Sequence, residues 1–244
     1  MCTRYIPPEM RELEAFWQIG AGKSVPAGLF KARELFPLAT GPIVRLDGAG
    51  DRMAQLAQWG MIPPDSETRI PMSRPRGPGE RPKRISTVNA RQETLASRPT
   101  YRDAWKRGQR CIVPARLFFE PNWETGANVW WRFLRADGQP WSVAGLWSEW
   151  TDPVTGELVP SYTMVTVNAD AHPLMKRMHK PNPRLGPDKQ DKRSLVLLEQ
   201  GEVDQWLRGT IEEARALIKL TPAEEFDAAP AEPPGAKGEA AELF

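Results

Sequence analysis

Tryptophan-rich runs with the composition of β-strands constrain the fold of this chain more than any other feature. The 244 residues include ten tryptophans against three tyrosines, and many of the tryptophans fall within such runs. Two of the runs, residues 129–134 and 141–147, flank Asp137-Gly138, which is typical of a β-hairpin turn. The length allows one large domain or two small ones with a sizeable core. The pattern therefore predicts a sheet-rich globular protein.

Hydrophobic periodicity and capping signals predict the other elements. Thr210 followed by Glu213 forms a capping box that marks the start of a helix. From Thr221 onward the chain holds mainly Ala, Glu and Pro, which predicts a disordered tail over 221–244 after a domain of residues 1–220. The predicted helices span 8–19, 101–106, 170–178, 203–207 and 210–217, and the further predicted strands are 53–59, a strand ending at 91, 111–114, 117–120, 161–167 and 194–198.

Charge is distributed unevenly behind a net charge of +2. Residues 69–116 carry thirteen Lys and Arg against three Asp and Glu, and residues 176–193 carry seven against two. Residues 201–244 carry four against ten. Two basic segments and an acidic end are typical of a protein that binds a polyanion such as nucleic acid, although solvated loops produce the same pattern.

Neither a membrane span nor a secretory signal is recognisable in the sequence. No apolar run approaches the ~20 residues that a bilayer-spanning helix needs, and the start MCTRYIPPEM has no apolar core like that of a signal peptide. Cys2 and Cys111 are too few for a disulfide framework. We therefore expect a protein of the reducing cytoplasm that makes no membrane contact.

The stretch of residues 87–123 concentrates groups that carry chemistry. It combines the amide of Asn89 with the carboxylates of Glu93 and Glu120 and a row of arginines. Glu120 lies between Phe119 and Pro121, and apolar surroundings raise the pKa of a carboxyl group, which makes Glu120 a candidate proton carrier. An ion pair between a strand glutamate and one of the arginines is the alternative interpretation.

Cys2 becomes an N-terminal cysteine if Met1 is removed. Its α-amine, with a pKa near ~7.7–8.0, and its thiol, with a pKa near ~8.5, would then both be partly available as nucleophiles. Such a 1,2-aminothiol reacts with an aldehyde in two steps, because the amine first forms an imine and the sulfur then closes a five-membered thiazolidine. A cysteine at position 2 also occurs by chance.

Six short motifs follow one another in a specific order between the first residue and about Leu207. They are Met1-Cys2-x-Arg4-Tyr5, Trp59-Gly60-x-Ile62-Pro63, Asn89-Ala90-Arg91-x-Glu93-Thr94, Arg110-Cys111-x-x-Pro114, Phe119-Glu120 and the region of His179. In this order and spacing the chain resembles the SOS response-associated peptidase (SRAP) family.

The resemblance implies an α+β fold, a single domain on a curved, barrel-like, mostly antiparallel sheet with flanking helices. It further implies a monomer without a cofactor that binds single-stranded DNA. In that family the cysteine exposed by loss of the initiator methionine bonds to the ring-opened aldehyde of an abasic site. The stable thiazolidine product shields the lesion from strand scission, and the name peptidase reflects proposed self-removal of Met1.

The resemblance also implies roles for individual residues. The implied catalytic residues are Cys2 as nucleophile, Asn89 as the amide that orients it, Glu120 as a proton carrier and His179 as promoter of imine formation and reversal. The implied DNA-binding residues are Arg4 and Arg91 at phosphates and Trp59 against a base.

A metal site is not expected, because two Cys and two His offer no recognisable ligand spacing.

The chain departs from the common family pattern in three places. Thr3 stands where Gly is usual, and the usual Tyr-Glu-Trp is replaced by Phe119-Glu120-Pro121-Asn122-Trp123. The His-x-Arg-Met-Pro block is replaced by Met178-His179-Lys180-Pro181, an inserted loop and Arg193. This last departure leaves His172 as an alternative to His179, which we favour because an apolar residue precedes it and the basic loop then returns to a strand at Ser194.

Two other functions fit the same residues. A non-catalytic single-strand binding module would use the basic groove and Trp59, and covalent capture of abasic DNA without borohydride separates it from the enzyme. An N-terminal-cysteine hydrolase would use the α-amine of Cys2 as base for the thiol, and turnover of a small amide or peptide would support it.

Overall fold

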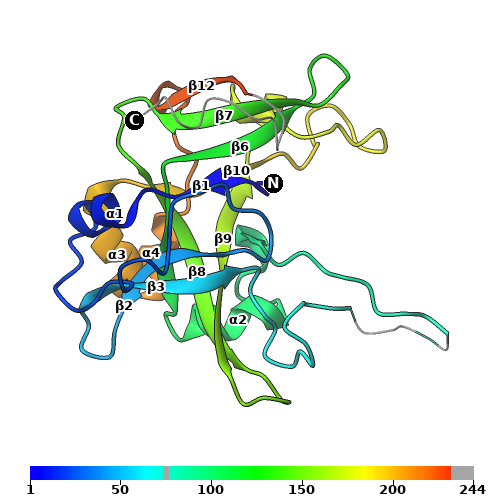
Figure 1. The fold of residues 1–244 in the computed structure, drawn as a ribbon. Helices are drawn as coiled ribbons and strands as arrows, with labels where there is room; N and C mark the ends of the chain where they lie inside the picture. Colours follow the sequence, from blue (N-terminus) through cyan, green and yellow to red (C-terminus); the bar gives the residue numbers. More distant parts are fainter. Residues whose placement is uncertain (74–76, 78, 232–244) are drawn as a thin grey trace.

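Two long antiparallel strands, β8 (Trp141–Thr151) and β9 (Leu158–Asn168), form the spine of the fold in this computed structural model. Pairing continues from β9 to β3 (Arg52–Trp59), β2 (Thr40–Leu46) and β5 (Arg110–Ala115), and from β5 back to β8. These five strands form a closed barrel in which β3 and β9 run parallel and the other neighbouring pairs run antiparallel (Figure 1). The predicted α+β fold on a barrel-like, mostly antiparallel sheet is therefore confirmed.

A second sheet lies across one end of the barrel (Figure 1). It contains the first strand of the chain, so the N-terminal residues are held between this sheet and the barrel. Its strands, in order, are β1 (Tyr5–Ile6), β6 (Leu117–Asn122), β7 (Val129–Arg135) and β12 (Phe226–Pro230), and the barrel strands are extended by β4 (Asn89–Arg91) and β10 (Arg193–Leu195) on β9 and by β11 (Leu197–Leu198) on β8.

Strand β12 corrects the predicted boundary of the C-terminal tail. The structure describes residues 1–73, 77 and 79–231, so the remainder of the predicted tail, 232–244, lies outside the described residues. Within 221–231, Phe226 is 8% exposed and its ring centroid lies 5.2 Å from that of Trp141. One aromatic anchor and an open edge of β7 are enough to order a segment whose composition is otherwise that of a disordered chain.

The helices pack mainly on the outside of the barrel, where Leu13, Trp105 and Trp206 bury their side chains in one apolar cluster. The predicted capping box is confirmed, since Thr210 Oγ1 accepts a hydrogen bond from the Glu213 backbone N–H. No helix in the described ranges has the length and apolarity to cross a membrane. The helical segments are α1 (Met10–Phe16), α2 (Pro99–Lys106), α3 (Val203–Arg208), α4 (Ile211–Ala216) and the 3-10 turns η1 (Gln92–Thr94), η2 (Met175–Arg177), η3 (Gln200–Glu202) and η4 (Ala223–Glu225).

The helix predicted over residues 170–178 is wrong, because only the turn η2 forms there. The Asp170 carboxylate accepts backbone N–H bonds from Asp191 and Lys192 and is therefore committed to a neighbouring loop. The His172 Nδ1 accepts the N–H groups of the two residues that follow Pro173. Side chains that bond the local backbone compete with helix formation, and periodicity alone does not reveal them.

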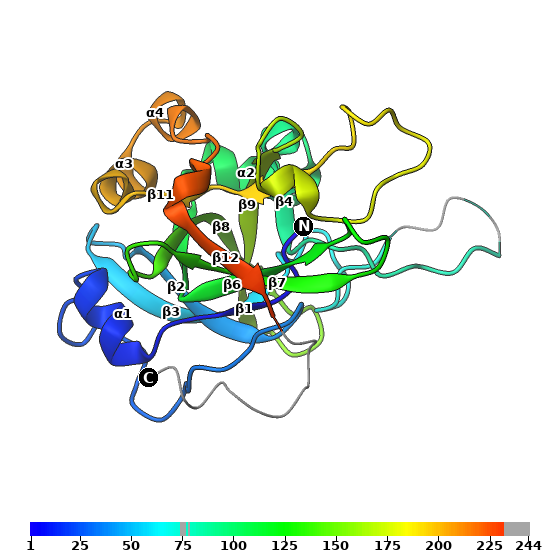
Figure 2. The same ribbon diagram turned by 90° about the horizontal axis from the view of Figure 1, so that it is seen from above.

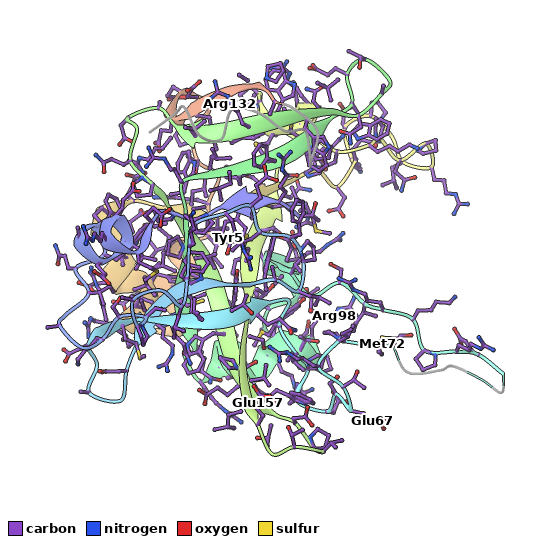
Figure 3. The ribbon with its side chains drawn as sticks, in the orientation of Figure 1. Tyr5, Glu67, Met72, Arg98, Arg132 and Glu157 are labelled. Atoms are coloured by element: carbon purple, nitrogen blue, oxygen red, sulfur yellow. The ribbon has the colours of Figure 1, made fainter. Side chains whose placement is uncertain are left out.

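A second apolar cluster fills the space between the barrel and the four-stranded sheet. Phe118 and Phe133 stack there with ring centroids 5.1 Å apart. Tyr5, labelled in Figure 3, reaches from β1 to the barrel, where its hydroxyl hydrogen-bonds with that of Tyr162 on β9. Cys2 belongs to the same cluster and is fully buried, so the start of the chain is part of the core.

Candidate active site around the N-terminus

Strand β1 anchors the N-terminal residues along β6. The Phe119 backbone N–H donates to the Arg4 carbonyl oxygen at 3.0 Å, and the Cys2 thiol donates to the same oxygen at 3.4 Å. Thr3 is exposed and does not occur among the residues with left-handed backbone, so the position usually held by Gly accepts Thr here. The result is a buried thiol in a defined place.

Glu120 links the N-terminus to a histidine. Its carboxylate, 1% exposed on β6, lies 3.5 Å from the Met1 α-amine and 2.7 Å from His179 Nε2. His179 is brought to this point because its backbone N–H donates to the Pro121 carbonyl at 2.6 Å. The N-terminal amine and the imidazole thus both contact Glu120 Oε2, and this contact allows proton transfer between the three groups.

The ionisation of Glu120 differs from the prediction. Burial raises the pKa of this carboxyl group, but the Met1 ammonium and His179 outweigh burial and hold the pKa below its ordinary value. The prediction of a raised pKa is therefore wrong for the chain that retains Met1. Phe119 and Pro121 are visible as apolar neighbours in sequence, whereas the two groups that stabilise the carboxylate come from distant segments.

The Cys2 thiol is held in its neutral form. Burial raises its pKa, and the nearby Glu120 carboxylate raises it further. A thiolate is the reactive form of cysteine, so the raised pKa lowers the reactivity of this thiol.

Asn89, on β4, contacts the same segment from the barrel side. Its Nδ2 donates to the Cys2 carbonyl oxygen at 2.7 Å. Its Oδ1 is buried and has no hydrogen-bond partner within the part of the chain that the structure describes. A buried acceptor without a partner is costly, which favours a donor from a ligand or from a rearranged N-terminus at this point.

The two histidines have separate places, and only His179 lies in the site. His172 is buried, with 5% of the residue exposed, and its ring nitrogens bond to backbone groups and not to Glu120. Its Nδ1 accepts two backbone N–H bonds, so Nε2 carries the proton and donates to the Thr221 carbonyl at 2.8 Å. Every ring nitrogen of His172 is occupied by backbone, which identifies it as a structural residue.

Two of the three predicted DNA-binding residues are buried. Trp59 is fully buried, donates its ring N–H to the Val88 carbonyl at 3.1 Å and packs edge-on against Tyr5, so it offers no face to a base. The Arg4 side chain is 6% exposed and pairs with Glu34, with its guanidinium 3.7 Å from the centre of the Phe119 ring. Both side chains pack in the core around Cys2 and do not face solvent in this structure, and their contacts with DNA stay predictions.

Arg91 alone of the three is open to solvent, with 44% of its side chain exposed. It pairs at 2.8 Å with Asp191, which also binds Arg193. Arg193 makes a two-pronged contact with Glu93 at 2.8 and 2.9 Å. The Asn89–Arg91 strand is therefore tied to the end of the basic loop 180–192.

Sequence reasoning missed Lys192, whose ammonium donates to the carbonyls of Met178 and His179 at 2.6 Å each. In sequence it is one of several lysines in a basic loop, and no local signal separates it from the exposed ones.

Residues 1–233 match the family described as SOS response associated peptidase (SRAP). The chain belongs to the SRAP family. The match extends past residue 220 to include β12, in agreement with the pairing of that strand with β7.

Solved structures share the SRAP fold of this chain. A crystal structure of a protein from Bordetella bronchiseptica is 33% identical, with 95% of this chain and 100% of that chain covered and a TM-score of 0.75. A protein from Bacteroides thetaiotaomicron has the same fold at 20% identity and a TM-score of 0.73, with 95% and 92% covered.

Named relatives are more distant and are matched over part of their length. The abasic site processing protein YoqW of Bacillus subtilis is 28% identical over 150 residues, which are 60% of this chain and 58% of that protein. The abasic site processing protein HMCES of Xenopus tropicalis is 24% identical over 138 residues, 50% of this chain and 38% of that protein. The match thus spans little more than half of YoqW and less of HMCES.

Proposed function

We propose that this SRAP protein binds single-stranded DNA and captures abasic sites as a thiazolidine through Cys2, after Met1 has been removed. The observation that carries the proposal is that the Met1 amine and the His179 imidazole both contact the Glu120 carboxylate beside the buried Cys2 thiol. The names of the relatives, abasic site processing proteins, point to the same lesion.

The chemistry needs only groups that this site brings together. The neutral Cys2 amine adds to the C1′ aldehyde of the opened sugar to give a carbinolamine, which loses water to give an imine. The Cys2 sulfur then adds to the imine carbon, and its proton passes to the nitrogen, closing the ring. Glu120 and His179 are placed to give and take the protons of the first two steps.

Removal of Met1 must precede capture, because the reacting amine belongs to Cys2. Hydrolysis of the bond between Met1 and Cys2 consumes one water and leaves the Cys2 amine within reach of Glu120, which already contacts the amine one residue earlier. We propose that the site catalyses this cleavage itself, since Glu120 already contacts the Met1 amine.

DNA binding is supported by the placement of the basic segments. The described residues 69–73 and 79–86 and the loop 180–192 project on the side of the molecule where the N-terminus lies (Figures 1 and 2). The Arg91 side chain is 44% exposed beside its ion pair with Asp191, so we assign it a contact with a phosphate. We propose a monomer acting in a reducing cytoplasm, which keeps the Cys2 thiol free.

The test is crosslinking of purified protein to an abasic single strand on a denaturing gel, without borohydride. The native protein should form a heat-stable band, and Cys2→Ala and Cys2→Ser should not, because an oxygen nucleophile gives a far more labile ring. Binding without a covalent band would favour the single-strand binding module. Turnover of a small amide or peptide by native protein, lost in Cys2→Ala, would favour the hydrolase.

A further inference from the structure

The backbone at His179 is in a conformation that a histidine rarely adopts. Its φ is +64°, in the left-handed region where a side chain costs free energy that surrounding contacts must supply. The other end of the same loop is also left-handed, with φ +58° at Asp191. Something must hold this turn, because the direction of the His179 ring toward Glu120 depends on it.

Lys192 supplies the contacts. Its ammonium donates to the carbonyl oxygens of the two peptide groups that flank the His179 Cα, those of Met178 and His179, at 2.6 Å each. Charge-assisted bonds of this length are about twice as strong as neutral ones. No other side chain in the described ranges is recorded as donating to either carbonyl.

The backbone of Lys192 is fixed on both sides, so the ammonium is delivered to a defined point. Its N–H donates to the Asp170 carboxylate at 2.8 Å, and its carbonyl accepts the Ala169 N–H at 2.7 Å. Strand β10 begins at the next residue, Arg193, and pairs with β9. The residue as a whole is 6% exposed, unlike the lysines within the loop.

We infer that Lys192 is a positioning residue, which acts through His179 by clamping the left-handed turn that aims the imidazole at Glu120. The expected change in crosslinking rate rests on the proposed function, whereas the expected change in the position of the His179 ring does not. The two bonds of Lys192 go to the peptide groups on either side of the His179 Cα, and these peptide groups set the direction of the His179 ring.

The test compares Lys192→Met with Lys31→Met, which removes the same charge from an exposed position outside the two basic segments and outside the site. Lys192→Met should slow crosslinking to an abasic single strand by ~10-fold or more, and by no more than His179→Ala does. In the double variant Lys192→Met, His179→Ala, the rate should equal that of His179→Ala alone. Lys31→Met should react at the native rate.

A spectroscopic readout is independent of activity. The chain has two histidines, so ¹⁵N-histidine labelling gives one ring signal set for His179 and one for His172, the internal reference. Lys192→Met should shift the His179 signals and leave those of His172 in place. The spectroscopic test does not depend on DNA capture. If native protein captures no abasic DNA, that result overturns the proposed function and leaves the role of Lys192 in positioning His179 to be tested by the ring signals.

Three results would overturn the inference. They are unchanged His179 signals in Lys192→Met, a native crosslinking rate in that variant, and multiplied defects in the double variant. Lys192→Gln, which leaves a polar tip beside the carbonyls, takes its place if Lys192→Met does not fold. Unfolding of both variants would make Lys192 an anchor of the fold and also overturn the assignment.

Discussion

Replacing Glu120 by Gln tests whether this carboxylate is the proton carrier of the site. The substitution preserves shape but removes the charge that lies 2.7 Å from His179 and 3.5 Å from the N-terminal amine. General acid–base assistance is worth ~10²–10⁴ in rate, so Glu120→Gln should slow capture of abasic DNA by about that factor. The defect should appear in time courses more than in end points, because the aminothiol remains.

Glu124→Gln is the matched control. Glu124 lies four residues further along, 47% exposed and paired with Arg177 at 2.8 Å, and its loss removes the same charge from the same face. Single-turnover time courses on denaturing gels should show a native rate for Glu124→Gln. A native rate in Glu120→Gln, or equal slowing in both variants, would refute the assignment of Glu120.

The depressed pKa of Glu120 also predicts how stability depends on pH. In the unfolded chain a glutamate titrates near ~4.3, and in the folded chain that retains Met1 the value is lower. The carboxylate therefore stabilises the fold above the unfolded pKa, and this contribution is lost as the pH falls through the folded value. Thermal melts of Met1-retaining protein should show the gap between native and Glu120→Gln narrowing in acid, and a gap that widens would contradict the pKa direction.

Three further predictions concern single side chains. His179→Ala should slow crosslinking while His172→Ala, if folded, keeps the native rate, and a paired time course in which only the His172 variant is slow would reverse the roles. Arg91→Ala should lower the slope of log affinity against log salt by roughly 0.7 for a single strand, and titrations with an unchanged slope would remove Arg91 from the phosphate contacts. Trp59→Ala should cost ~3–5 kcal/mol of stability in denaturant melts, and weaker DNA binding at native stability would restore the stacking role.

Local patterns in the sequence were sufficient for much of the fold. The capping box at Thr210 and the turn at Asp137-Gly138 are decided by a few adjacent residues, and the structure contains both. The predicted β-hairpin is wrong, because the strands on either side of that turn, β7 and β8, belong to different sheets and do not pair with each other. The tail strand β12 was not predictable, because it depends on the free edge of β7 and on one apolar anchor, Phe226. Such partners are supplied by the tertiary fold.

The candidate site is likewise predictable from the sequence only in part. Short motifs singled out Cys2, Asn89, Glu120 and His179, and the structure brings them together around the N-terminus. Short motifs do not reveal which side chains are buried or which charges from distant segments lie beside them. Trp59 was predicted to face DNA but is enclosed by the second core cluster, and the pKa of Glu120 is set by groups that lie far away in sequence.

The intact mass of the protein after incubation with an abasic single strand tests the central claim most directly. The account predicts an adduct whose mass equals that of the chain starting at Cys2 plus the DNA, less one water, because imine formation releases one water and ring closure releases none. The adduct should form without borohydride and be absent in Cys2→Ala. An adduct that retains Met1, that requires borohydride, or that forms equally in Cys2→Ala would contradict it.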